Sequence, residues 1–395
     1  MNVAVNAISA KVGGAATYLA NVLPELQRRI VEDRRGRLVV FRGAGEGSFP
    51  EGIDYRFDAG ASERAGRSGT LRRLWFDQVK LPMLLRREAM DVLFSSANFG
   101  PLVCPCRQVL LVRNTIYFDA TFLDRAAARV RANYLAQRAL VLASMAAADS
   151  VLFPSRAMLD LAASHAGGSK PRWRVAHYGT RRDLFHPPEL QEDKQELARP
   201  GGSHDKSAPV RLLNVSLYCD QKNLGTLLSA LRLLHVRDRG RYRLDLTAGF
   251  GRSSLEDNPM CPNFREERAL YEDLHAAGVA FDTDWRGYTT LPDLYRSAGI
   301  FVFSSYTESF GHPLVEAMAT GLPIVASDIP VNRELCGDAA VYFPTFDAEA
   351  CAAAIQRVAE DPALRGRLRE AALGRAAAFT WERHADALME AFDGK

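Results

Sequence analysis

The chain has 395 residues, of which 47% are hydrophobic and 25% are charged. This usage is ordinary for globular proteins, so collagen-like repeats, low-complexity disorder and small disulfide-bonded domains are excluded, and the length predicts two or three domains. The net charge is only +3, yet residues 1–183 carry 27 basic and 16 acidic side chains, whereas residues 184–395 carry 23 and 31. We therefore expect a basic N-terminal domain followed by an acidic C-terminal one.

The first half alternates short apolar runs with longer amphipathic stretches, which predicts βαβ units around a mostly parallel sheet. The N-terminus lacks the basic segment and long apolar run of a secretory signal, and the cysteines are scattered, so we expect a cytoplasmic protein. The expected strands are 2–8, 38–42, 54–58, 91–95, 108–112, 150–154 and 174–177, and the expected helices are 17–30, 71–86, 126–147 and 156–163.

Residues 187–209 are rich in Pro, Gly, Ser and charge and interrupt this pattern, as an interdomain linker does. The alternation then restarts, which predicts a second α/β unit of the same kind. Its expected strands are 211–215, 242–248, 279–281, 300–304, 323–327 and 340–343, and its expected helices are 224–235, 265–275, 291–298 and 314–319, followed by 348–360, 363–378 and 381–392.

The stretch from 301 to 328 is the most informative part of the sequence. A buried strand leads into a loop with Glu308, Phe310 and Gly311, and Pro313 stands where a first helical residue is favoured. A helix start just beyond the end of a parallel strand offers backbone N–H groups and a positive dipole to phosphates. Glu308 precedes this helix and Glu316 is expected in its first turn, so the two carboxylates would bracket a phosphate-bearing ligand.

This stretch resembles the glycosyltransferases of family 4 (glycosyl transferases group 1), which have the GT-B fold and retain the anomeric configuration. Residues 305–327 read SYTESFGHPLVEAMATGLPIVAS, and the matching positions are Ser305, Glu308, Phe310, Gly311, Pro313, Glu316, Gly321 and Pro323. The resemblance implies an α/β protein with two Rossmann-like domains facing across a cleft. Residues 1–183, joined by a last helix at about 381–395 that crosses back, would bind the acceptor. Residues 184–380 would bind a nucleotide-activated sugar.

The resemblance also implies roles for individual residues. Glu308 would face the donor sugar, residues 310–314 would meet the diphosphate and sugar hydroxyls, and Glu316 would hold the ribose. Lys222 would neutralise the leaving diphosphate, and the turn at 286–288 would lie near the nucleobase. The donor-binding residues expected in this way are Ser216, Lys222, Arg286, Gly287, Tyr288, Glu308, Ser309, Phe310, Gly311, His312, Pro313, Leu314 and Glu316.

Two positions depart from the family pattern. Ser216-Leu217 stands where relatives have Gly-Arg, so one cation for the diphosphate is missing. Arg113-Asn114 stands where many relatives have His-Asp, and Asn114 joins Glu308 and Lys222 as a candidate catalytic residue. Gly13 and Gly14, with Arg113, match a loop that reaches toward phosphate and acceptor, and an ordinary turn is the alternative reading.

We therefore predict a retaining hexosyltransferase that takes sugar from a nucleotide-diphosphate sugar, a co-substrate, and needs no cofactor or metal. The acceptor would be a glycan, a lipid-linked sugar or a small molecule, as in bacterial polysaccharide or glycoconjugate biosynthesis. The residues leave open a nucleotide-sugar epimerase, a non-catalytic sugar-binding module and an inactive relative. Asp282-Thr283-Asp284 is read as a solvated loop rather than a metal site.

The arginines of the first half fit either peripheral contact with the anionic inner face of a membrane, a phosphate-bearing acceptor, or a plain solvated surface. Nucleic acid is not expected, because no binding motif accompanies the charge. The basic residues in question are Arg64, Arg67, Arg72, Arg73, Lys80, Arg86, Arg87, Arg125, Arg129, Arg131 and Arg138.

Overall fold

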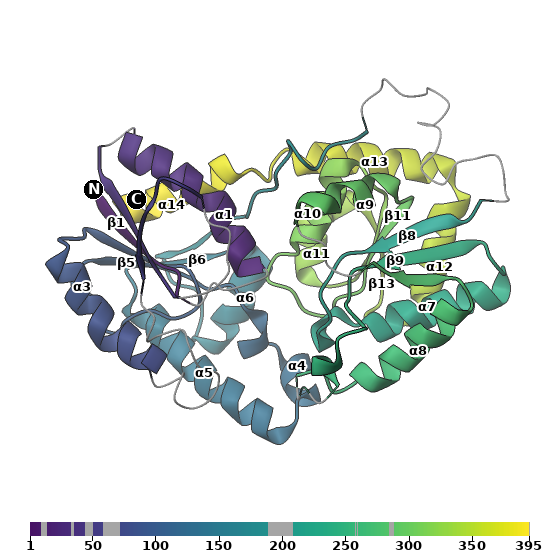
Figure 1. Cartoon of the computed structure of the whole chain (residues 1–395), viewed down its shortest axis with the longest axis horizontal. Helices are drawn as coiled ribbons and strands as arrows, with labels where there is room; N and C mark the ends of the chain where they lie inside the picture. Colours follow the sequence, from purple (N-terminus) through teal and green to yellow (C-terminus); the bar gives the residue numbers. More distant parts are fainter. Residues whose placement is uncertain are drawn as a thin grey trace. The chain divides into compact units, whose positions relative to one another are not determined.

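The structure, a computed structural model, describes residues 1–8, 14–32, 35–43, 50–57, 72–188, 208–256, 258, 260–283 and 288–394. The chain divides into two compact units, drawn in Figure 1. The first unit comprises Met1–Phe118, Ala132–Gly179 and Thr380–Lys395, and the second comprises Asp119–Arg131 and Thr180–Phe379. Of the expected linker at 187–209, residues 189–207 lie outside the described part of the chain.

Within the described residues, the first unit contains a seven-stranded parallel sheet of order β3-β2-β1-β4-β5-β6-β7. Its strands form because their side chains are apolar on both faces, as in sheets covered on both sides, and their central residues are buried. All seven expected strands are present with slightly different ends. They are β1 (Asn2–Asn6), β2 (Arg37–Arg42), β3 (Asp54–Phe57), β4 (Val92–Ser95), β5 (Arg107–Leu111), β6 (Ser150–Phe153) and β7 (Trp173–Val175).

The helices of the first unit follow the expected pattern with two irregularities. Helix α1 continues as a π-turn, and the helix that begins at residue 72 contains another π-turn before α3. The C-terminal helix α14 packs against α1, where the Tyr18 hydroxyl and His384 Nε2 lie 2.8 Å apart. The helices are α1 (Gly14–Gln27), α3 (Leu81–Arg87), α5 (Ala128–Ala147), α6 (Arg156–His165) and α14 (Trp381–Asp393).

The second unit contains, among the described residues, a six-stranded parallel sheet of order β10-β9-β8-β11-β12-β13. Strand β11 pairs with both β8 and β12, so the chain leaves β8 toward one edge of the sheet and returns to fill the other half. The strands are β8 (Val210–Asn214), β9 (Tyr242–Leu246), β10 (Ala280–Asp282), β11 (Ile300–Phe303), β12 (Ile324–Ser327) and β13 (Ala340–Phe343).

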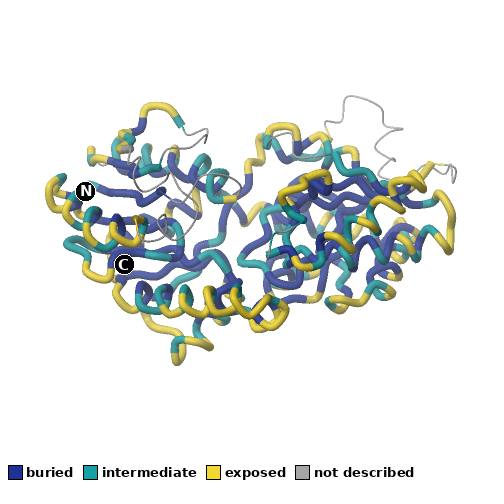
Figure 2. Tube along the Cα trace, turned by 60° about the horizontal axis from the view of Figure 1, so that its bottom comes forward, coloured by how far each residue is buried: buried dark blue, intermediate teal, exposed yellow. Residues whose placement is uncertain are grey.

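The helices of the second unit form two packed groups. α7 contacts both α8 and α12, and α9 and α11 each contact α10. Figure 2 shows long dark-blue, buried segments in this unit, and the core combines side chains of the strands with those of α7, α8 and α12. Helix α11 was not expected from the sequence. The helices are α7 (Leu224–Arg237), α8 (Phe264–Ala276), α9 (Leu291–Ser297), α10 (His312–Thr320), α11 (Pro330–Cys336), α12 (Ala348–Glu360) and α13 (Pro362–Ala376).

One short segment changes the domain boundary that we drew from the sequence. Residues 119–131, which we placed in the N-terminal domain, pack with the second unit, and so do residues 180–183. The segment contains the short helix α4 (Ala120–Arg125), and α5 begins inside it, so the single helix expected at 126–147 is in fact preceded by a separate one. The Asp119 side chain caps α4 by accepting from Phe122 N at 2.8 Å.

Candidate functional site

The site is built where the strand order of the second sheet reverses. Strands β8 and β11 are neighbours, but their following connections run to opposite edges of the sheet. In open parallel sheets, ligands bind beyond the carboxyl ends of the strands at this reversal, because the two departing loops leave a crevice there. Lys222 follows β8, and Glu308 follows β11.

The loop after β11 ends in the helix start that the sequence predicted, with a shifted boundary. Helix α10 begins at His312, so Pro313 is its second residue and Glu316 lies beyond its first turn, rather than within it as we expected. Gly311 has φ 90° and ψ 61°, a left-handed conformation that disfavours residues with a Cβ. The backbone N–H groups of such a first turn point along the helix axis toward any anion placed there.

Lys222 and Glu308, two of the three predicted catalytic residues, meet in this structure. Lys222 Nζ lies 2.5 Å from Glu308 Oε1, and both side chains are largely shielded from solvent. Burial opposes the charge on Lys222, but the Glu308 carboxylate outweighs burial and raises the pKa of the ammonium. The site therefore holds a fixed positive charge whose ammonium has further hydrogens for a phosphate oxygen.

Hydrogen bonds to backbone carbonyl groups hold the turn with Lys222 against the loop with Glu308. Tyr306 N donates to Gln221 O at 3.0 Å, and Ser304 Oγ donates to Lys222 O at 2.9 Å. Asn223, in the left-handed region at φ 50°, donates through Nδ2 to Ser304 O at 3.2 Å. The spacing of the ion pair is thus determined by two loops that are tied together along their length.

Glu316 lies on α10 with only 4% of its surface exposed. Burial raises the pKa of Glu316 to about 7, although hydroxyl groups of Tyr295 and Tyr288 hydrogen-bond the carboxylate and favour its charged form. The Tyr295 hydroxyl donates to Glu316 Oε2 at 2.8 Å. The structure thus joins two predicted donor residues, Glu316 and Tyr288, and adds Tyr295. Arg286 and Gly287 lie outside the described residues.

The other predicted donor residues line the same end of the sheet with different exposures. Phe310 is buried against the Phe379 ring, with centroids 5.9 Å apart, so its backbone rather than its ring is available to a ligand. Ser216 is also buried, and its hydroxyl donates to Asn214 Oδ1 at 2.9 Å. Leu217, at the position of the missing arginine, has 37% of its surface exposed and supplies no charge.

The residues predicted in the N-terminal half belong to the first unit. The Arg113 guanidinium lies over the Tyr18 ring at 5.3 Å, and a Cβ placed on Gly14 would be 3.7 Å from Arg113 Nη2. Asn114 caps a short helical turn, because its side chain accepts from Ile116 N at 3.3 Å. Gly13 lies outside the described residues. Arg113 and Gly14 therefore lie close together, and the Asn114 side chain is hydrogen-bonded within its own turn.

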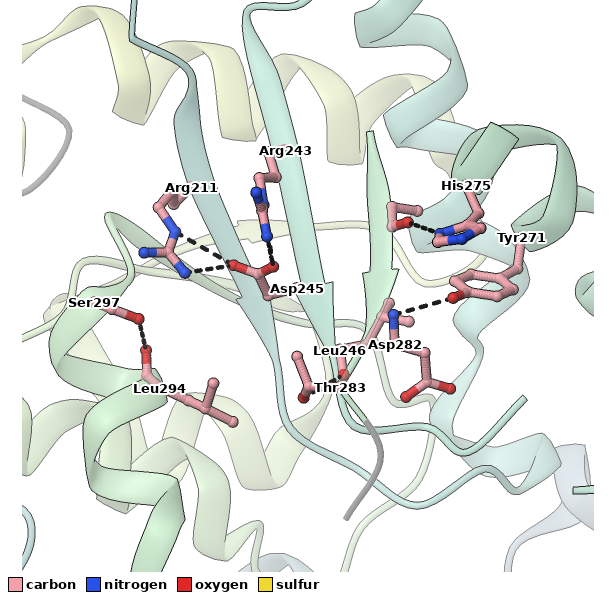
Figure 3. A network of polar contacts seen from close by, with 11 residues as sticks. Arg211, Arg243, Asp245, Leu246, Tyr271, His275, Asp282, Thr283, Leu294 and Ser297 are labelled. Atoms are coloured by element: carbon pink, nitrogen blue, oxygen red, sulfur yellow. Dashed lines mark hydrogen bonds and ion pairs between the residues drawn. The ribbon is translucent and has the colours of Figure 1, made fainter. Parts of the chain in front are cut away.

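The first two residues of the Asp-Thr-Asp stretch connect the end of β10 to the end of β9 and the segment that follows it. Asp282 Oδ2 accepts from Phe250 N at 2.7 Å, and Thr283 Oγ1 donates to Leu246 O at 3.0 Å, whereas Asp284 is not described. Figure 3 shows Asp282, Thr283 and Leu246 together with the buried Asp245, which pairs with Arg211 at 2.9 Å and Arg243 at 3.1 Å. Among the described residues, no group of three or more His, Cys, Asp or Glu side chains is arranged to hold a metal ion.

Sequence reasoning missed three residues that shape this site. Asp220 and Tyr306 lie two positions before Lys222 and Glu308, and the Tyr306 hydroxyl donates to Asp220 Oδ2 at 2.6 Å. Arg125, from α4, contacts the same carboxylate. The Asp220–Lys222 spacing was visible in the sequence, but an aspartate in a turn is common, and no local signal pointed to Arg125.

The chain resembles known proteins in sequence and in fold. Residues 204–375 match the model of the family described as glycosyl transferases group 1. The O-antigen chain mannosyltransferase B of Escherichia coli is 34% identical over 163 residues, which cover 41% of this chain and 40% of that relative. The chain thus matches less than half the length of this curated relative.

Solved structures extend the likeness to the whole chain. Sucrose-phosphate synthase from Thermosynechococcus elongatus has a TM-score of 0.73 at 18% identity, covering 100% of this chain and 98% of that one. Anabaena Alr3699/HepE in complex with UDP and glucose has a TM-score of 0.69 at 18% identity, covering 100% and 99%. Residues 204–375 therefore resemble the glycosyl transferases group 1 family, and the chain as a whole has the GT-B fold that the sequence predicted.

Proposed function

We propose that this chain is a retaining glycosyltransferase that moves a hexosyl group from a nucleotide-diphosphate sugar to a glycan, lipid-linked or small-molecule acceptor. The Lys222–Glu308 pair at the start of α10 is the observation that carries this proposal. A departing nucleoside diphosphate gains negative charge, and a fixed cation beside helical N–H groups stabilises that charge more in the transition state than in the ground state.

The roles of the acidic residues follow from their surroundings. Glu308 would accept hydrogen bonds from sugar hydroxyls while it holds Lys222 in place, and the ammonium would keep donors for a phosphate oxygen. Glu316 would accept from the ribose hydroxyls in place of Tyr295 or Tyr288. The leaving phosphate would take the acceptor proton on the same face of the sugar, so no second carboxylate at the ~5 Å spacing of retaining glycosidases is needed.

Two of the compared proteins support the substrate classes. The Anabaena structure contains UDP and glucose, which supports a nucleoside-diphosphate sugar as donor. The O-antigen mannosyltransferase supports a role in bacterial polysaccharide or glycoconjugate biosynthesis. No cofactor or metal takes part in the proposed reaction.

A thermal-shift panel of UDP-, GDP-, ADP- and dTDP-sugars tests the donor assignment. A donor that binds the folded chain raises its melting temperature by mass action, by an amount equivalent to about 2.7 kcal/mol at 100 times Kd. Glu316→Ala should lose this response, whereas Glu272→Ala, an exposed carboxylate on α8, should keep it. A full shift in Glu316→Ala would remove the ribose assignment.

The same panel separates the alternative functions once products are analysed. An epimerase would convert the donor into another nucleotide sugar without any acceptor. A sugar-binding module would bind free sugar without a nucleotide. An inactive relative would bind the donor and transfer nothing, and any acceptor-dependent release of nucleoside diphosphate would exclude it.

We also propose that the first unit contacts an anionic membrane through one side of the helix at 72–87. Trp75, Val79 and Met83 are spaced by four residues and expose 56%, 44% and 64% of their surfaces. Arg72 and Arg86, both exposed, continue the same row at its two ends. An apolar row with an exposed Trp and cationic ends is typical of helices that lie in the headgroup region.

The adjoining loop extends this apolar surface. Leu102 N donates to Gln78 Oε1 at 2.9 Å, and Gln78 Nε2 donates to Gly100 O at 3.2 Å. These bonds hold the loop, with its exposed Leu102 and Val103, against the helix. Among the described residues, no helix is both long and apolar enough to cross a membrane.

Sedimentation with vesicles tests the membrane contact. We expect the chain to bind vesicles of phosphatidylcholine that contain phosphatidylglycerol, and to bind pure phosphatidylcholine far less. Trp75→Ser with Met83→Ser should abolish binding, whereas Val236→Ser, an exposed apolar residue of the second unit, should not change it. Equal binding by the double variant and the wild type would contradict this contact.

A further inference from the structure

A buried carboxylate, that of Asp220, lies in the same helical turn as Lys222. The Asp220 side chain has only 3% of its surface exposed and begins the helical turn that ends at Lys222. Three side chains donate to it: the Arg125 guanidinium at 3.1 and 3.3 Å, Asn263 Nδ2 at 2.9 Å and the Tyr306 hydroxyl at 2.6 Å. A carboxylate so enclosed has no room for substrate, so its role must be exerted through its neighbours.

Those neighbours connect Asp220 to both members of the pair. Asp220 O accepts from Asn223 N at 3.0 Å, which closes the turn that presents Lys222. Tyr306 lies two residues before Glu308 in the loop after β11. One carboxylate thus joins the Lys222 turn to the Glu308 loop, in addition to the backbone contacts between them.

Arg125 supplies the charge that this arrangement needs. Burying an unpaired carboxylate costs several kcal/mol, and the bidentate guanidinium offsets that cost. The guanidinium also lies 5.6 Å from the Tyr306 ring centroid and 5.2 Å from that of Phe346. The hydrogen bonds from Arg125 to Asp220 raise the pKa of the guanidinium, even though burial opposes its charge.

Arg125 lies in the segment 119–131, which packs with the second unit. We propose that Asp220 and Arg125 are positioning residues for the Lys222–Glu308 pair: Asp220 holds the two loops at the spacing the pair requires, and Arg125, inserted from α4, holds Asp220. This inference rests on the proposed transferase function. It predicts that the catalytic step depends on a residue from the N-terminal half of the sequence that touches no substrate.

Steady-state kinetics of the full chain test this role. Asp220→Asn keeps the shape but removes the charge, and Arg125→Ala removes the partner. Both should lower kcat by about 10- to 100-fold, since a displacement of about 1 Å at a reacting group costs that much, while donor KM changes by less than about 3-fold. Arg125→Lys should recover only part of kcat, because an ammonium cannot form two parallel contacts.

A double-mutant cycle separates positioning from general loss of stability. In a Lys222→Met background, Asp220→Asn should lower the remaining activity by less than about 2-fold, because the residue it positions is already absent. A merely structural role would lower activity by the same factor in both backgrounds. Arg268→Ala, in the same unit but paired with Glu256 and Glu272, is the matched control and should leave kcat unchanged.

The outcomes distinguish this inference from the function on which it rests. Wild-type transfer together with unchanged kcat in Asp220→Asn would overturn the positioning role alone. Equal losses in both backgrounds would also overturn it. A wild-type chain that neither binds a nucleoside diphosphate, measured by calorimetry, nor transfers sugar would overturn the proposed function and the positioning role together.

Discussion

In the second unit, the loops that leave β8 and β11 are joined by charged side chains, whereas in the first unit Arg113, after β5, lies over the rings of Tyr18 and Tyr178. Both sheets are parallel and both reverse their strand order beside a central strand. Two sheets of similar topology therefore have different groups beyond their strands: a buried ion pair in the second unit, and a cation over buried aromatic rings in the first.

The aromatic rings of the first unit form one buried cluster that includes side chains of the C-terminal helix α14. Tyr18, Tyr178, Trp381 and His384 have ring centroids 5.0 to 6.2 Å apart. Such a cluster stabilises the first unit through packing. In the second unit, a buried ion pair instead fixes the positions of two charged side chains. Under the proposed function, the second unit would hold the diphosphate and the first unit would bind the acceptor.

The largest expected effect tests the ion pair itself. Lys222→Met should lower kcat by about 100- to 1000-fold, as does removal of other fixed groups that stabilise transition-state charge. Release of nucleoside diphosphate in the presence of acceptor measures this loss. A reduction of less than about 10-fold would show that another cation performs the task assigned to Lys222.

The two units should respond to pH in opposite directions. Burial lowers the pKa of His384 to about 4, below its ordinary 6.5, so the unfolded chain takes up a proton between these values and the folded unit does not. Acidification through this window should remove about 3 kcal/mol of stability from the first unit. Glu316 has a pKa raised from 4.5 to about 7, so the second unit should lose about 3 kcal/mol as the pH rises from 4.5 to 7.

Hydrogen exchange of β4 and β11 peptides, followed from pH 4.5 to 7.5, reports each unit separately. Removing the titrating group in His384→Asn should flatten the pH dependence of the first unit only, and Glu316→Gln should flatten that of the second only. If either variant kept the wild-type slope in its own unit, the buried group would not be the cause.

A smaller effect is expected at the helix start. Gly311→Ala forces a Cβ into the left-handed region and should cost about 1–2 kcal/mol of stability. A Cβ at Gly311 would also lie 3.3 Å from Leu314 Cδ1, so the first turn of α10 should shift and weaken donor binding. Denaturant unfolding and donor calorimetry measure the two losses, and unchanged values for both would show that this backbone conformation is not required.

The smallest effect is expected in the first unit. Arg113→Met removes a cation from the Tyr18 and Tyr178 rings and should cost about 0.5–1 kcal/mol of stability. Because this unit is proposed to bind the acceptor, the KM for acceptor should rise more than the KM for donor. The reverse split would place Arg113 at the donor and would remove the distinction between the two units.

Local sequence patterns were sufficient to predict the strands, because buried parallel strands are apolar on both faces. They also predicted the start of α10, because Gly311-His312-Pro313 is typical of the beginning of a helix. Lys222 and Glu308 were assigned through the family resemblance, and both follow strands that a Rossmann-like order brings together. The seven-residue α11 was missed because it is too short to show a clear period.

The residues that we propose position the pair could not be predicted from local sequence patterns. Arg125 and Asp220 are 95 residues apart, and neither position has a local feature that marks it. Residues 119–131 pack with the second unit, and no local feature of this segment marks that packing, so the domain boundary could not be placed from composition. Tyr295, which donates to Glu316, stands in a short helix where no local pattern marks it.

A structure of the full chain with a bound nucleoside diphosphate tests the central claim most directly. The account predicts a diphosphate oxygen at about 3 Å from Lys222 Nζ, beside the backbone at the start of α10, with the ribose hydroxyls on Glu316. A nucleotide held instead by Gly14 and Arg113 of the first unit, with the Lys222–Glu308 pair untouched, would contradict it.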